Sequence, residues 1–129
     1  MAPRILIVDD NSDCRSMLAR CLDRLGYETS EAENSAQAIE KAVAERPDLI
    51  LTDLRLPDMD AVRAAAILKQ DPLAGKIPII VLTGMADARC RRQALKSGIA
   101  RYLLKPISLS QLSAEIQMFA EGAGACCPT

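Results

Sequence analysis

The chain has 129 residues, the size of a single domain that can bury its own hydrophobic core. Half of the residues are hydrophobic but only Tyr27, Tyr102 and Phe119 are aromatic, which predicts the aliphatic core typical of parallel sheets. Sixteen basic and seventeen acidic residues give a net charge of -1, which excludes an overall field that would attract nucleic acid or an anionic membrane.

The absence of histidine and the spacing of the cysteines limit the kinds of active site that this chain can have and the cellular compartment in which we expect it. Without histidine, zinc sites and Ser/His or Cys/His nucleophile pairs are disfavoured. The five cysteines have no paired spacing, and Cys14 and Cys21 are expected to be small core residues. The sequence has no secretory signal pattern and no apolar run long enough to span a membrane. We therefore expect a cytoplasmic protein without membrane contact.

The first half of the chain predicts two strands and two helices. Residues 5–8 are apolar throughout, as in a strand covered on both faces, and residues 27–31 are half polar, as in an edge strand. Ser12 would cap a first helix that ends at Gly26, and Ser35 would cap a second helix that stops before Pro47. The helical side chains expected to face inward are Cys14, Met17, Leu18, Cys21, Leu22, Leu25, Ala38, Ile39, Ala42 and Val43.

The second half continues the alternation of strands and helices. Residues 49–51, 79–82 and 102–104 predict three further strands, and an Ala-rich helix is expected from 60 to 69. Asp87 would cap a fourth helix that Gly98 closes, and Ser108 with Gln111 forms a capping box for the fifth. The side chains expected to face inward are Cys90, Ala94, Leu95, Leu109, Leu112, Ile116 and Phe119. Such alternation predicts one α/β domain with a parallel sheet and helices on both faces.

Polar side chains follow four of the predicted strands, at the edge of the sheet where such folds place their functional groups. They are Asp9, Asp10, Asp53, Thr83 and Lys105. Taken singly, each has an ordinary explanation as a turn, cap or solvated loop residue. Together, two carboxylates about 4 Å apart repel by roughly 4 kcal/mol at an effective dielectric of 20, so three of them require compensation. Mg²⁺ and Lys105 could supply it, and Asp53 could then attack phosphorus to form an aspartyl phosphate.

These segments resemble the receiver domain of bacterial two-component response regulators. The matching stretches are ILIVDDN at 5–11, PDLILTDLRLPDMD at 47–60, PIIVLTG at 78–84 and GIARYLLKP at 98–106. The resemblance implies a flavodoxin-like (βα)5 three-layer sandwich with a parallel sheet of order 2-1-3-4-5. We expect this receiver domain to cover residues 1–120, followed by a flexible tail or linker at 121–129.

The resemblance also implies a role for each residue at the sheet edge. Asp53 would accept a phosphoryl group from the phosphohistidine of a histidine kinase or histidine phosphotransfer protein, with Mg²⁺ as the cofactor. Asp10, Asp53 and the backbone carbonyl of Arg55 would bind the metal, and Asp9 would act through a water molecule. Thr83 and Lys105 would hold the phosphoryl group.

The implied output is a change of surface rather than a turnover reaction. Thr83 and Tyr102 would act as the switch that alters the surface of the fourth helix, fifth strand and fifth helix. That surface would control a downstream protein or a fused output domain, and the family admits a phosphorylation-dependent homodimer. Arg55 and Met85 hold the two variable positions that tune how quickly water removes the phosphate. We expect no turnover enzyme and no direct nucleic-acid binding by this chain.

Arg89, Arg92 and Lys96 lie at spacings of three and four residues on the predicted fourth helix. This basic face could suit an acidic partner, although a solvated helix face explains the same pattern. One departure from the family is Ala61, which replaces the glycine usually found after the Pro-Asp-Met-Asp stretch. The sequence CCPT at 126–129 superficially resembles a prenylation signal, and we interpret Cys126 and Cys127 as a chance match.

Three alternatives fit the sequence less well. A phosphatase of the haloacid dehalogenase kind would carry an aspartate two residues after the nucleophile, where this chain has Arg55. A flavin-binding flavodoxin cradles phosphate in its first loop, where Asp9 and Asp10 would repel it. The third alternative is a receiver-like docking module that works without phosphorylation.

Overall fold

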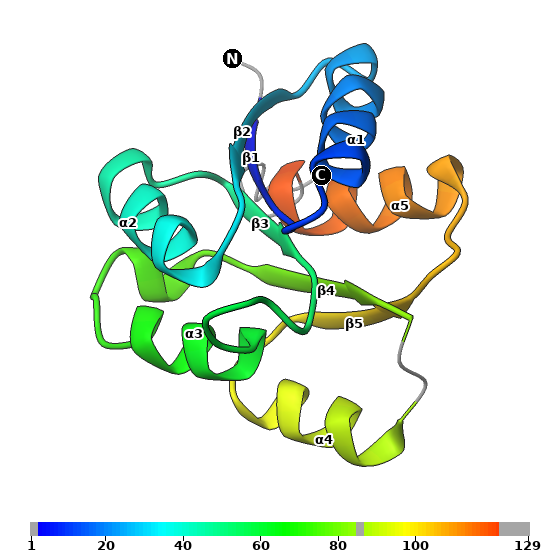
Figure 1. The fold of residues 1–129 in the computed structure, drawn as a ribbon. Coiled ribbons are helices and arrows are strands. Elements are labelled where there is room, and N and C mark those ends of the chain that lie inside the picture. Colours follow the sequence, from blue (N-terminus) through cyan, green and yellow to red (C-terminus); the bar gives the residue numbers. More distant parts are fainter. Residues whose placement is uncertain (1–2, 85–86, 122–129) are drawn as a thin grey trace.

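The structure, a computed structural model, describes residues 3–84 and 87–121 as a three-layer α/β fold (Figure 1). Its five strands are parallel and form one sheet in the order β2-β1-β3-β4-β5. The strands are β1 (Arg4–Val8), β2 (Glu28–Ala32), β3 (Leu49–Thr52), β4 (Ile79–Thr83) and β5 (Arg101–Leu104). The predicted fold class, the strand order and the edge position of the half-polar strand are confirmed.

The helices cover both faces of this sheet. They are α1 (Ser12–Arg24), α2 (Ser35–Glu45), α3 (Ala61–Leu68), α4 (Ala88–Lys96) and α5 (Leu109–Ile116). Figure 1 shows α1 and α5 on one side of the sheet and α2, α3 and α4 on the other. The sequence did not predict a short 3-10 helix, η1 (Ala74–Lys76), or a π-helical segment, η2 (Gln117–Glu121).

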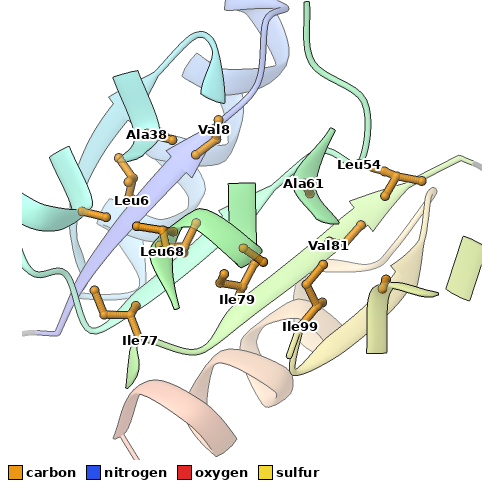
Figure 2. Packing of buried hydrophobic residues seen from close by; sticks show 14 of the residues in the cluster. Leu6, Val8, Ala38, Leu54, Ala61, Leu68, Ile77, Ile79, Val81 and Ile99 are labelled. Atoms are coloured by element: carbon orange, nitrogen blue, oxygen red, sulfur yellow. The ribbon is translucent and has the colours of Figure 1, made fainter. Parts of the chain in front are cut away.

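Successive side chains of the central strands point to opposite faces of the sheet and belong to two separate hydrophobic clusters, one on each face. In β1, Leu6 and Val8 belong to the cluster beneath α2, α3 and α4, whereas Ile5 and Ile7 belong to the cluster beneath α1 and α5. All four are almost completely buried, and each contributes about 1.5–3 kcal/mol to stability. Figure 2 shows the first cluster, with strand and helix side chains in contact: Leu6, Val8, Ile79, Val81, Ala38, Ala61 and Leu68. Two-sided burial explains why these strands are apolar throughout.

Two predicted helix caps are wrong by one residue. Asn11 caps α1 by accepting from the Cys14 N–H at 3.0 Å, although Ser12 was expected there. Asn34 likewise caps α2 in place of Ser35, which is completely buried. Asparagine is at least as good an N-cap as serine, so the choice between neighbours is decided by the path of the chain.

The remaining helix boundaries agree with the sequence. Asp60 and Asp87 cap α3 and α4, and the capping box of α5 is present. Gly26 and Gly98 follow the ends of α1 and α4 with positive φ angles of 96° and 99°, which glycine adopts without strain.

Several side chains expected to face inward lie instead at the solvent. Between 41% and 61% of each is exposed, and they are Met17, Leu25, Val43, Leu95 and Leu109. Cys14 and Cys21 are only half-buried. A helix on a sheet contacts it along a narrow strip, so the outer positions of a wide apolar stripe remain in water. The inner positions are buried as expected, among them Leu22, Ala38, Ala94, Leu112 and Ile116.

The end of α2 stores local backbone strain at Arg46. This exposed residue has a φ of 50°, in the left-handed region, and it precedes Pro47. The substitution Arg46→Gly should therefore raise the free energy of unfolding by about 0.5–1 kcal/mol in urea titrations followed by circular dichroism. As a control, Arg24→Gly in the last helical turn of α1 should lower it by up to about 1 kcal/mol. Destabilisation by both substitutions would contradict this interpretation.

None of the helices in the described ranges, 3–84 and 87–121, combines the length and the apolar character needed to cross a bilayer. The predicted tail or linker lies almost wholly outside the described residues, as do Met85, Cys126 and Cys127. The expectations for these residues remain predictions.

Candidate functional site

Two aspartates leave the sheet side by side at the ends of its central strands. Val8 of β1 pairs with Thr52 of β3, so the next residues in each strand are Asp9 and Asp53. The Asp53 N–H donates to the Val8 carbonyl at 3.1 Å, which continues the β1–β3 pairing by one residue. The parallel register therefore fixes the backbones from which both carboxylates project.

Asp9, Asp10 and Asp53 form one cluster, as the sequence predicted. One carboxylate oxygen of each residue lies within 4.8 Å of the others. Asp9 is buried, Asp53 is half-buried and Asp10 is exposed, so the cluster opens to solvent on the Asp10 side. Carboxylate oxygens are hard donors, and one or two of them together with waters are what Mg²⁺ binds in proteins. The donor set fits the predicted metal.

The environment of Asp53 opposes its ionisation. Burial is the main factor that raises the pKa of this carboxyl group, and the neighbouring charges of Asp9 and Asp10 raise it further. The Lys105 ammonium and the Leu54 N–H, which donates to Asp53 Oδ1 at 2.8 Å, act in the opposite direction. The pKa of Asp53 remains above its usual range, so the charged form of this side chain costs free energy in the folded protein.

Lys105 lies between two of the three acids. Its Nζ atom is 3.8 Å from Asp53 Oδ2 and 3.9 Å from Asp9 Oδ2. The Lys105 N–H also donates to the Thr83 carbonyl at 2.8 Å, which ties the end of β5 to the end of β4. The following Lys105–Pro106 bond is cis, a geometry that the sequence allowed. Lys105 is thus a local counter-charge for the cluster, with its side chain still partly exposed to solvent.

Arg15 supports this edge of the sheet and was missed in the sequence. Its Nη1 donates to the Asp9 carbonyl at 2.6 Å, and its Nε donates to Glu31 at 3.0 Å. The Lys41 ammonium in turn donates to the Glu31 carbonyl. The charge patterns of the two helices gave no signal for these contacts, because the bonds run from α1 and α2 to the backbone of Asp9 and to the edge strand β2.

Asp58 binds the start of α2, although it lies in the loop before α3. Its carboxylate accepts from the Ser35 N–H at 2.9 Å and the Ala36 N–H at 2.8 Å. These are the first residues of α2, 22 and 23 positions earlier in the chain. No sequence pattern indicated this contact, because four of the five α-helices, not α2 alone, lack an acidic residue in the first turn.

The predicted switch residues lie at the expected strands. Thr83 is buried at the end of β4, and Tyr102 is buried in β5. Burial raises the pKa of the Tyr102 hydroxyl; the nearby Cys90 and Asp87 raise it further, and the Arg55 guanidinium lowers it. Arg55 is therefore close enough to Tyr102 to act on it electrostatically.

The three basic residues proposed for partner binding are all exposed on α4. A separate depression of about 470 Å³ is lined by residues of α4 and β5, among them Arg91, Arg101 and Tyr102, and by Asp87. This depression includes none of the three residues that the helical spacing selected and does not test them. Partner binding by Arg89, Arg92 and Lys96 remains a prediction.

Comparison with known proteins agrees with this geometry. The family model for the response regulator receiver domain matches residues 5–117. The phosphate regulon transcriptional regulatory protein PhoB of Pseudomonas aeruginosa is 42% identical over 113 residues, which are 88% of this chain and 49% of that protein. The chain spans about half the length of the curated relatives it matches first.

Solved structures show the same fold. The receiver domain of sensor histidine kinase PA1611 from Pseudomonas aeruginosa, with a magnesium ion coordinated in its active site cleft, has a TM-score of 0.86 at 30% identity, covering 94% of this chain and 99% of that one. A response regulator structure from Chloroflexus aurantiacus has a TM-score of 0.87 at 27% identity, with coverages of 94% and 99%. The family match over residues 5–117, the shared fold and the acidic cluster show that this chain belongs to the response regulator receiver domain family of two-component signal transduction.

Proposed function

We propose that Asp53 accepts a phosphoryl group from the phosphohistidine of a histidine kinase or histidine phosphotransfer protein, with Mg²⁺ as the cofactor. The observation that carries this proposal is the arrangement at the sheet edge. Three carboxylates lie within 4.8 Å of one another, and the Lys105 ammonium is 3.8–3.9 Å from two of them. The magnesium ion in the related receiver domain of PA1611 supports the same cofactor here.

The residues present can perform each part of the transfer. An oxygen of Asp53 forms a bond to phosphorus while the bond between phosphorus and the donor atom breaks, and the donor atom keeps the electron pair. The Leu54 N–H holds Asp53 Oδ1 at 2.8 Å and so limits rotation of the nucleophile. Lys105, already beside Asp53 Oδ2, would neutralise charge on the phosphoryl oxygens.

The metal would be held by Asp10, Asp53 and the Arg55 carbonyl, with Asp9 acting through a water molecule. When bound, Mg²⁺ would neutralise negative charge on the incoming phosphoryl group. Asp9 is suited to an indirect role, because the Asn11 N–H at 2.9 Å already engages its Oδ1 and Lys105 faces its Oδ2.

The output would be a population shift. Contacts from the phosphoryl group to Thr83 and Lys105 exist only in the phosphorylated form and would favour one arrangement of β4, β5 and α4. Tyr102 lies in β5 beside the depression lined by Arg91, so its movement would change that surface. A downstream protein, a fused output domain or a second copy of the chain would read this change. The domain would then regulate rather than turn over a substrate.

The direct test is phosphoryl incorporation, measured by intact-protein mass spectrometry. The purified chain should gain one phosphoryl group when incubated with Mg²⁺ and either acetyl phosphate or a phosphohistidine donor, and peptide mapping should locate it at Asp53. Chelation of the metal or the substitution Asp53→Asn should prevent the gain. If several donors leave wild type unlabelled in the presence of Mg²⁺, the docking module without phosphorylation becomes the better interpretation.

A further inference from the structure

Two sets of hydrogen bonds hold the loop between Asp53 and α3. The Ala61 N–H donates to the Leu54 carbonyl at 2.8 Å, which joins the two ends of the loop. Within the loop, Asp58 binds the first residues of α2. Arg55, whose backbone carbonyl the proposed function assigns to Mg²⁺, lies between Leu54 and Asp58.

Asp58 completes the cap of α2 from outside that helix. The first four N–H groups of an α-helix, counted from the N-cap residue, have no partner within it. In α2, the Ser35 and Ala36 N–H groups donate to the two oxygens of Asp58, and the Gln37 N–H donates to Asn34 at 2.8 Å. These N–H bonds lower the pKa of the Asp58 carboxyl group, so the charged form is the one that is bound.

Ser35 makes a second link between the same two segments. Its side chain is completely buried, and its hydroxyl donates to the Met59 carbonyl at 3.0 Å. Two consecutive loop residues, Asp58 and Met59, are therefore held by one end of one helix. This also explains why the serine is buried and leaves the capping role to Asn34.

We infer that Asp58 is a positioning residue for the metal site: its bonds to α2 hold the 54–60 loop in the conformation that presents the Arg55 carbonyl to the cluster of Asp9, Asp10 and Asp53. This inference rests on the proposed function. A backbone carbonyl has no rotamer of its own, so its direction is set by the path of the loop. Without Asp58, the loop would have to be ordered when the metal binds, and this loss of entropy would weaken binding.

The test is Mg²⁺ affinity, measured by isothermal titration calorimetry without any phosphoryl donor. Partners that orient a metal ligand typically change metal affinity by about 10–100-fold, so Asp58→Ala should weaken Mg²⁺ binding by about tenfold. Ser35→Ala, which removes no charge, should weaken it by a smaller factor of roughly three, because the bonds from Asp58 remain.

Asp71→Ala is the matched control. Asp71 accepts two backbone N–H groups, those of Leu73 and Ala74, each at 2.9 Å. Like Asp58, it carries one charge, and its N–H bonds lower the pKa of its carboxyl group. Its substitution removes the same charge and the same kind of cap at η1, so Mg²⁺ affinity should stay at the wild-type value.

The outcomes separate the inference from the proposed function. If wild type fails to bind Mg²⁺, the proposed function itself fails. If wild type binds and Asp58→Ala binds equally well, or if Asp71→Ala weakens binding as much, Asp58 has no positioning role. Should Asp58→Ala fail to fold by circular dichroism, Ser35→Ala decides, and wild-type affinity in that variant overturns the inference.

Discussion

Replacing Asp53 with asparagine should stabilise the metal-free protein at pH 7 while abolishing phosphoryl incorporation. The amide removes a half-buried charge that lies within 4.8 Å of two other carboxylate oxygens. Repulsion between unit charges at such a distance is about 1 kcal/mol even at the dielectric of water, and Lys105 offsets part of it. We therefore expect the free energy of unfolding to rise by about 1 kcal/mol in urea titrations.

The same comparison at lower pH checks the cause. The folded-state pKa of Asp53 is raised, so its ionisation weakens the folded state only when the pH is above the unfolded value. The advantage of Asp53→Asn should thus shrink as the pH falls through the raised pKa. It should vanish below about 3.9, the usual value for aspartate, where wild type is also neutral in both states.

A control and a metal titration complete this prediction. Asp13→Asn, at an exposed position in the first turn of α1, should not stabilise the protein at any pH. Adding Mg²⁺ should stabilise wild type by mass action and reverse the order of wild type and Asp53→Asn. Lower stability of the metal-free asparagine variant at pH 7 would mean that attraction to Lys105 outweighs the burial and repulsion of Asp53.

Replacing Lys105 with methionine should have the opposite effect on stability and a large effect on phosphoryl transfer. The ammonium is 3.8 Å from Asp53 and 3.9 Å from Asp9, so its loss leaves the acids without their local counter-charge. Because Lys105 is partly exposed, we expect a loss of only about 1–2 kcal/mol in the metal-free protein. The rate of phosphoryl incorporation at saturating Mg²⁺ should fall about a hundredfold, the usual effect of removing one donor to a developing negative charge.

Mg²⁺ affinity distinguishes a local charge effect from general damage to the fold. Lys105 and the metal neutralise the same carboxylates, so Lys105→Met should bind Mg²⁺ more tightly than wild type. Lys76→Met, which removes an exposed charge at η1, should leave stability, affinity and rate unchanged. Weaker Mg²⁺ binding by Lys105→Met would contradict the competition between lysine and metal.

The strand ends were predictable because their positions follow from local patterns. Apolar runs ending in Asp9, Asp53, Thr83 and Lys105 indicated both the parallel sheet and the edge at which these groups meet. The register that pairs Val8 with Thr52 then brings the acids together without further information. Their mutual proximity is thus a direct consequence of strand order.

The supporting contacts were not predictable in the same way. Asp58 and Ser35 are 23 positions apart, and Arg15 reaches Glu31 on a neighbouring strand. Such bonds depend on how two segments pack, and no spacing in the sequence specifies that. The exposure of Met17 and Leu109 was not predictable for a similar reason. Periodicity identifies the apolar stripe of a helix but not which part of that stripe the sheet covers.

Helix α4 buries little apolar surface against the rest of the domain. Of its nine residues, all of them described, only Ala94 is fully buried, whereas α3 buries Ala61, Ala64, Ala65 and Leu68. One buried methyl group is worth about 0.8 kcal/mol, close to the net value of a single hydrogen bond. Releasing this helix would therefore cost about as much free energy as one or two polar contacts provide. The change proposed for the surface of α4 and β5 would then need only a small difference in free energy at the sheet edge.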